Sequence, residues 1–117
     1  MSCLKTWEMK CHKKGDTRRA NVLTFPFDIT GFTFLMQFRL SEIGTNDNPV
    51  AFEWSSSENS FEITSATTTE SKLLMKKKLI EVEQGFYVSD LQIALPNGDI
   101  ETYFDANITI VEDYSRP

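Results

Sequence analysis

The stretch FTFLMQFRL, residues 32–40, decides the fold class of this chain. Its apolar residues recur at every second position, and the polar Thr33, Gln37 and Arg39 fall between them. Successive side chains of a strand point to opposite faces of a sheet, whereas a helix would scatter these residues round its circumference. The stretch therefore predicts a strand with one face in a hydrophobic core. That face comprises Phe32, Phe34, Met36, Phe38 and Leu40.

A second alternating segment begins at Gly85 and is followed by a turn signal. One face of this predicted strand comprises Tyr87, Ser89, Leu91, Ile93 and Leu95. The sequence Pro96-Asn97-Gly98-Asp99 then separates it from another apolar run that starts at Ile100. Asn-Gly between two such runs is a strong hairpin signal, so residues 85–110 are predicted to form two antiparallel strands.

The rest of the chain carries shorter strand patterns. They cover about residues 1–14, 20–25, 50–54, 61–64 and 72–78. A helix over about residues 69–83 is the competing interpretation of the last of these, because Lys, Leu, Met and Glu all favour helices. About seven to nine short strands with regular turn signals are typical of an all-β antiparallel sandwich or barrel.

The length of 117 residues fits one domain. We expect a β-sandwich domain over residues 15–113, with a basic N-terminal arm or first strand over residues 1–14 and a polar tail over residues 114–117. No apolar run is long enough for a membrane-spanning helix, and the first twenty residues hold no apolar region of a signal peptide. These features predict no membrane partner and a cytosol-like compartment.

Charge is unevenly distributed along the chain, whose net charge is −5. Residues 1–19 hold six basic and two acidic side chains, whereas the remaining 98 residues hold six basic and fifteen acidic ones. A basic edge on an acidic body could dock onto an acidic neighbour, including another copy of the chain. Alternatively, these charges solvate an edge strand and protect it against aggregation. The candidate partner-binding residues are Lys5, Lys10, Lys13, Lys14, Arg18 and Arg19.

The cysteines and the single histidine give no metal site. Cys3 and Cys11 are the only cysteines, and His12 is the only histidine, so a structural zinc site of the usual nitrogen and sulfur type cannot be completed. In one extended strand the two cysteines lie about 26 Å apart, so a disulfide would need a turn between them. We expect free thiols, no metal and no cofactor.

No arrangement of residues predicts catalysis. The sequence lacks a nucleophile elbow, a phosphate-binding loop and a dinucleotide fingerprint. Asp90 is the only carboxylate within a strongly patterned strand, where it is either a buried polar contact or an exposed residue of the outer face. We expect a protein that is not an enzyme and has no small-molecule substrate.

The net charge and the aromatic residues bear on two further kinds of ligand, nucleic acid and carbohydrate. The acidic net charge opposes a surface that tracks phosphates, so no nucleic-acid partner is expected. A β-sandwich that binds a carbohydrate or another ligand, as in host-receptor recognition, is the alternative function, with Trp54 or Tyr103 as a stacking surface. Trp54 ends an alternating strand, however, so burial in the core is the favoured interpretation.

The order of the turn and strand motifs resembles a family of small tailed-phage virion domains. Such domains occur at the N-terminus of phage baseplate upper proteins and in short tail-module proteins. The matching motifs are Gly15-Asp16-Thr17, Asp28-Ile29-Thr30-Gly31, Phe32 to Arg39, Gly85 to Leu91, Pro96-Asn97-Gly98-Asp99 and Asn107-Ile108-Thr109-Ile110. The chain departs from the family pattern at Ser89, where a second aromatic residue is common, and at Asp105-Ala106, where a glycine is common.

The resemblance implies an immunoglobulin-like β-sandwich that acts as a connector in a tail, baseplate or collar. It implies a location in the virion, and in the host cytoplasm during assembly. It also implies partners among other virion proteins and copies of the chain itself, and it carries over no catalytic residue. If the basic arm mediates assembly, deletion of residues 1–14 should leave a folded monomer that no longer assembles.

Overall fold

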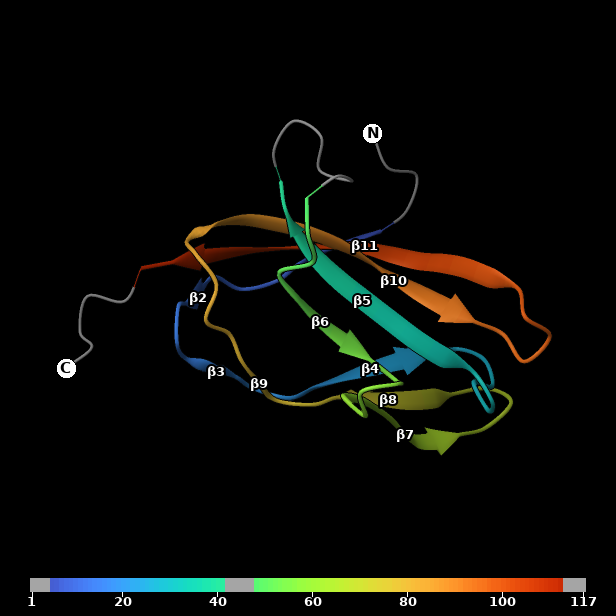
Figure 1. Cartoon of the computed structure of the whole chain (residues 1–117). Helices are drawn as coiled ribbons and strands as arrows, with labels where there is room; N and C mark the ends of the chain where they lie inside the picture. The colour runs from blue at the N-terminus through green and yellow to red at the C-terminus, as the bar shows by residue number, and fades with distance from the viewer. Residues whose placement is uncertain (1–4, 42–47, 113–117) are drawn as a thin grey trace.

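The computed structural model describes residues 5–41 and 48–112. The larger of its two layers is a sheet whose central strands are the two that the sequence marks most clearly (Figure 1). In spatial order it contains β1 (Thr6–Glu8), β11 (Ile100–Val111), β10 (Gly85–Ala94), β5 (Thr33–Leu40) and β6 (Phe52–Ser55). The short β2 (His12–Lys13) also pairs with β11. β1 and β2 run parallel to β11, and the other pairs of this sheet are antiparallel.

The second layer faces this sheet across the core. It contains β4 (Asn21–Phe25), β8 (Ser71–Met75) and β7 (Phe61–Ala66), all antiparallel in that order. A further antiparallel pair is formed by β3 (Thr17–Arg18), which precedes β4 in the chain, and β9 (Lys78–Leu79), which follows β8. Figure 1 shows this pair beyond the ends of β4 and β8.

The strand order is that of an immunoglobulin-like sandwich, which confirms the predicted fold. β5, β10 and β11 occupy the places of strands C, F and G, and β4, β8 and β7 those of strands B, E and D. β6 adds a strand beside β5, as in variable-type domains. The described residues contain no helix long and apolar enough to cross a membrane.

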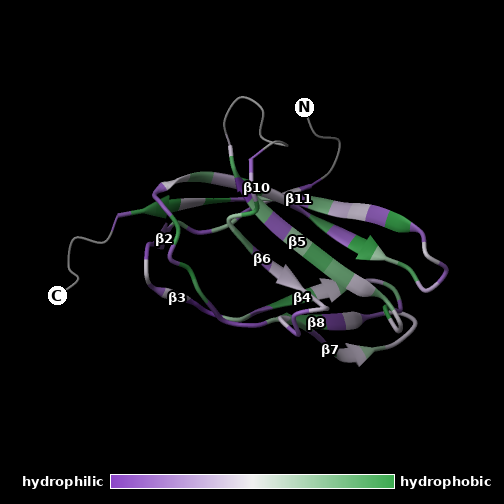
Figure 2. Ribbon diagram, viewed as in Figure 1, coloured by the Kyte–Doolittle hydropathy of each residue, from purple (hydrophilic) through white to green (hydrophobic). Residues whose placement is uncertain are grey.

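Both predicted apolar faces lie in the core. Phe34, Met36 and Phe38 of β5 are buried, and so are Leu91 and Ile93 of β10. Figure 2 shows hydrophobic and hydrophilic bands alternating along β5. The intervening residues face outward, so one side of the sheet is free for contacts with solvent or a partner.

The competing helix over residues 69–83 does not form. Within β8, Leu73 and Met75 are buried while Lys72 is exposed, which is the period of a strand. Each of these strand residues pairs with β4 on one side and with β7 on the other. Tertiary pairing therefore overrides the helix propensity of Lys, Leu and Met.

The hairpin between β10 and β11 forms, although its loop contains three residues. Gly98 N–H donates to the Leu95 carbonyl, and Leu95 N–H donates to the Asp99 carbonyl. Gly98 has a φ of 95°, whereas Asn97 does not have a positive φ. This is a type I turn followed by a left-handed glycine, and Pro96 favours it because its ring fixes the φ that the second position of a type I turn requires.

The N-terminal segment, expected as an arm or a first strand, forms an edge of the sandwich. Met9 is only 6% exposed, and its N–H donates to the Asn107 carbonyl. The ring of Trp7 packs edge-on against Phe104. Contacts also cross the expected boundary after residue 14, because Lys14 N–H bonds to the Val111 carbonyl. The expected tail over residues 114–117 lies outside the described residues.

Candidate docking faces

The six basic residues singled out in the sequence belong to different parts of the fold. Lys5, Lys10 and Lys13 are exposed along the edge formed by β1 and β2. Arg19 is exposed between β3 and β4, in the other layer. Lys14 and Arg18 are partly buried and make contacts within the domain. The structure therefore does not gather the six residues into one continuous arm.

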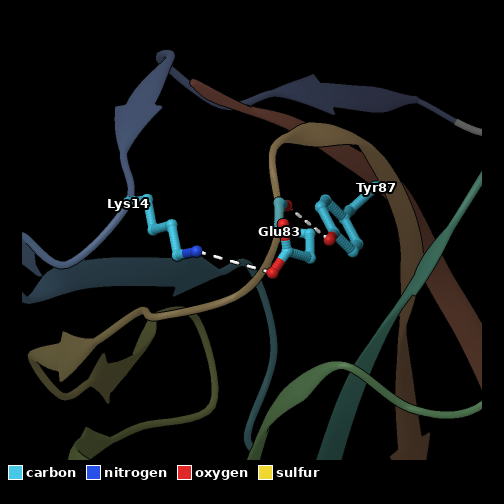
Figure 3. A network of polar contacts seen from close by, with 3 residues as sticks. All are labelled: Lys14, Glu83 and Tyr87. Carbon is cyan, nitrogen blue, oxygen red and sulfur yellow. Dashed lines mark hydrogen bonds and ion pairs between the residues drawn. The ribbon is translucent and has the colours of Figure 1, made fainter. Parts of the chain in front are cut away.

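Lys14 helps to hold the segment before β10 (Figure 3). Its Nζ lies 3.5 Å from Oε1 of Glu83. The Tyr87 hydroxyl donates to the Glu83 carbonyl over 2.6 Å. Burial, together with the charge of Glu83, raises the pKa of Tyr87 above its ordinary value. A tyrosine early in strand F that bonds to the backbone a few residues upstream is the tyrosine corner of immunoglobulin-like domains.

Arg18 covers an aromatic ring at the edge of the core. Its guanidinium carbon lies 5.7 Å from the centre of the Trp7 ring, and Nη2 donates to Oδ1 of Asn21. Burial lowers the pKa of Arg18 below its ordinary value. Arg18 thus contributes to packing between the two layers.

The outer side of the β4–β8–β7 layer combines positive and apolar side chains. Val22 and Leu79 are 56% and 55% exposed, and Leu74 lies opposite Val22 in the sheet. Lys72 is exposed within β8, and Lys77 is exposed just before β9. We call this surface the basic face; it comprises Val22, Lys72 and Leu74 of the layer itself and the exposed Arg19, Lys77 and Leu79 beside it. Glu62 of β7 lies opposite Leu74 on the same side. The neighbouring Lys76 forms an ion pair with Glu62 at 3.4 Å.

The outer side of the larger sheet is acidic. Asp90 of β10 lies directly opposite Asp105 of β11, and Thr6 of β1 lies opposite Asp105 on the other side. Glu53 pairs with Gln37, and Glu8 pairs with Asn107. We call this surface the acidic face; it comprises Glu8, Glu53, Asp90 and Asp105. Two positive side chains of the described strands also look outward here: Arg39 of β5, which donates to the Asn48 carbonyl, and Lys13 of β2, which pairs with Val111 at the end of the sheet.

A hollow of about 450 Å³ opens at the centre of the acidic face. It is lined by Thr6, Leu35, Gln37, Arg39, Val88, Ser89, Asp90, Gln92, Asp105, Ala106 and Asn107. Burial, and to a lesser degree the charge of Asp105, raises the pKa of Asp90. Like charges directly opposite each other in a sheet are destabilising, so a positive group placed in the hollow would relieve this repulsion.

Of the two candidates for ligand stacking, Trp54 lies in the core and Tyr103 lies at its rim. Trp54 is 1% exposed, and its Nε1–H donates to the Lys76 carbonyl over 2.8 Å. Lys78 Nζ lies 5.5 Å from the centre of its ring. Stacking of a ligand on Trp54 is therefore wrong as an interpretation, because the ring is already covered. Tyr103 is half-buried, with its ring 5.0 Å from that of Phe25 and 5.9 Å from that of Phe27.

No metal site is formed by the described residues. They contain no group of three or more His, Cys, Asp or Glu side chains placed to hold an ion. Cys11 is an exposed free thiol, and Nε2 of His12 lies 2.8 Å from the Asp16 carbonyl oxygen. Cys3 lies outside the described residues.

Sequence reasoning missed both halves of this arrangement. Lys72 and Lys77 were expected in the predicted strand over residues 72–78, and the sequence does not say that they share a layer with Arg19. Counting back from the hairpin without an irregularity places Asp90 opposite Phe104. A bulge at Leu91/Gln92 shifts the register, and Asp90 faces Asp105 instead.

Comparisons with known proteins add little to this description. No protein-family model matches the chain, and no curated protein matches it. Among solved structures, the structure of murine CRIg is similar at a TM-score of 0.36 and 10% sequence identity, over 93% of this chain and 92% of that one. The assignment of the immunoglobulin-like fold therefore rests on the strand order described above.

Proposed function

We propose that this chain is a small structural virion protein of a tailed bacteriophage, acting as a connector in a tail, baseplate or collar. The observation that carries the proposal is where the family-like motifs fall in the fold. Gly85, Phe86 and Tyr87 start the strand that carries the tyrosine corner. Pro96 to Asp99 forms the hairpin loop between β10 and β11. The order of these motifs along the chain is what resembles the phage virion domains.

The motif Asp28-Ile29-Thr30-Gly31 also occupies a defined turn. Oδ1 of Asp28 accepts hydrogen bonds from the Thr30 N–H at 2.9 Å and from its hydroxyl at 2.7 Å. These bonds lower the pKa of Asp28. Gly31 follows with a φ of 81°, which favours glycine. The motifs that carry the resemblance are thus turns and strand segments that build the sandwich, in keeping with a domain whose function depends on its surfaces.

A connector must contact at least two neighbours. The acidic face and the basic face lie on the outer sides of the two layers, so each can meet a separate component. The carbohydrate-binding alternative has less support, because the covered ring of Trp54 removes its strongest stacking platform.

The proposal is tested with a tagged full-length chain produced during phage growth. Purified particles and the proteins captured with the tag are both identified by mass spectrometry. We expect the chain in particles at a fixed ratio to tail or portal proteins. A tagged host protein of similar size is the control for carry-over. Absence from particles, together with capture of no viral protein, would contradict the proposal.

A further inference from the structure

We propose that copies of this chain associate head to tail, with the basic face of one copy packed on the acidic face of the next. This inference deepens the proposed function, on which it rests for its biological meaning, by naming the partner of both faces. The contact itself is a property of the purified protein and can be tested without particles.

Charge complementarity favours a second copy as the occupant. The acidic face carries the four carboxylates of Glu8, Glu53, Asp90 and Asp105, against the two positive side chains of Arg39 and Lys13 on the same side of the sheet. The basic face carries Arg19, Lys72 and Lys77, while the neighbouring Lys76 is already paired with Glu62. Opposite potentials across an interface favour encounter and fix its register, whereas like charges brought together oppose it.

The shape and the apolar content of the basic face also suit an interface. Val22 and Leu79 each expose more than half of their residue surface there, with Leu74 opposite Val22. The acidic face offers a hollow with Leu35 and Val88 in its lining beside the two aspartates. The two longest extents of the molecule are 47 and 32 Å, which leaves room for the roughly 800 Å² per partner of a standard interface.

The arrangement of charges determines the symmetry of the contact. A two-fold contact would place the acidic face against itself, or the basic face against itself, and both are repulsive. The complementary contact joins two different surfaces, so it repeats from copy to copy. Such a contact gives a closed ring or an open filament, according to the rotation between successive copies.

The test uses charge reversal on each face of the full-length chain. The acidic-face variant is Glu53→Lys/Asp105→Lys, and the basic-face variant is Lys72→Glu/Lys77→Glu. Sedimentation velocity over a range of concentrations measures association at low salt. Wild type is expected to associate, and each variant alone is expected to weaken association by about tenfold or more, because like charges then meet in the contact.

Mixing the two variants gives the sharpest result. In the mixture, the reversed acidic face of one variant meets the reversed basic face of the other, and both unreversed faces also meet. We expect association to return in the mixture, and to weaken with added salt. Restoration cannot arise from attraction between the net charges of the two variants, because both variants remain net negative at pH 7.

A matched control reverses two carboxylates that lie off both faces. Glu58 is exposed in the turn after β6, and Glu81 is exposed between β9 and β10. Glu58→Lys/Glu81→Lys makes the same change in net charge as the acidic-face variant and is expected to associate as wild type does. If the acidic-face variant does not fold, judged by circular dichroism, Glu8→Lys/Glu53→Lys replaces it at the margin of the face.

Two outcomes would overturn the inference. One is a wild-type chain that stays monomeric at low salt and high concentration. The other is a pair of single-face variants that associate as strongly as wild type. A monomeric chain that is nevertheless found in particles would remove this inference and leave the proposed function, whereas association through these faces without incorporation into particles would do the reverse.

Discussion

At the scale of single residues, two side chains of β10 have a raised pKa, and each owes it to burial and to a nearby carboxylate. Asp90 lies opposite Asp105 on the neighbouring strand β11, and the Tyr87 hydroxyl donates to the Glu83 carbonyl just before β10. Asp90 belongs to the acidic face, whereas Tyr87 belongs to the inner side of the same strand. One strand therefore serves both the surface and the fold, through its two alternating faces.

Asp90→Asn is expected to stabilise the protein at pH 7. The pKa of Asp90 is raised in the folded state, so its ionised form lowers the free energy of unfolding, and the wild type regains that stability as the pH falls through the raised pKa. Removing one of two opposed charges is worth about 0.2–1 kcal/mol, or a rise in Tm of about 1–4 °C. Thermal unfolding at pH 7 and pH 3 measures the effect.

The gain should vanish well below the ordinary aspartate pKa of 3.8, because Asp90 is then protonated in both the folded and the unfolded state. Glu101→Gln, at an exposed position of β11, is the control and should change Tm little at either pH. A gain from Asp90→Asn of the same size at both pH values would contradict the electrostatic explanation.

Tyr87→Phe is expected to lower the free energy of unfolding by about 1 kcal/mol, because it removes the hydroxyl that donates to the Glu83 carbonyl. Urea unfolding followed by fluorescence measures it. Tyr103→Phe removes the hydroxyl of a half-buried tyrosine packed on Phe25 and is the matched control. Equal losses in the two variants would assign no special role to the tyrosine corner.

At the scale of elements, the edge formed by β1 and β2 is part of the core structure. Met9→Ala is expected to cost about 2–5 kcal/mol, because it leaves a cavity where a buried side chain now packs. Lys10→Ala, at the next and exposed position, should change the free energy of unfolding by less than about 0.5 kcal/mol. Chemical denaturation of both variants gives the comparison.

This result bears on the deletion of residues 1–14, which was expected to leave a folded monomer. The deletion removes Met9 and the strands that cover the edge of β11, so it should destabilise the domain as well as alter its contacts. Charge reversal on the two faces is the cleaner way to separate assembly from folding.

Two glycines allow the contribution of turn geometry to be measured. Gly98→Ala is expected to cost about 1 kcal/mol from its φ of 95° alone, because nothing lies within 4 Å of an added Cβ. Gly31→Ala should cost more, since its φ is 81° and an added Cβ lies 3.1 Å from Cγ of Pro96. Thermal unfolding of both should preserve this order; the reverse order would show that the Pro96 contact relaxes freely.

At the scale of the whole molecule, the sandwich separates two charged surfaces that the sequence mixes. Arg19 is far from Lys72 and Lys77 in the chain, yet all three belong to one layer. Asp90 and Asp105 come from two strands of a hairpin and share the opposite side of the molecule. Head-to-tail association through these surfaces is predicted to weaken as salt increases, since exposed charges are screened.

The sequence by itself determined the fold class and the two best strands. Side chains of a strand alternate with period two, so a one-sided core leaves its pattern in residues 32–40 and 85–95 whatever they pair with. The turns at Gly98 and at Asp28–Gly31 could also be predicted from the sequence, because their geometry depends on local residues.

Only the tertiary structure decided which charges share a surface. Lys14 and Arg18 look alike in the sequence to Arg19, yet one pairs with Glu83 and the other stacks on Trp7. The meeting of Asp90 and Asp105 depends on a bulge, and a shift of one residue would have placed Asp90 opposite Phe104. Pairing between strands distant in sequence is set by the packing of the whole core, so no local pattern encodes it.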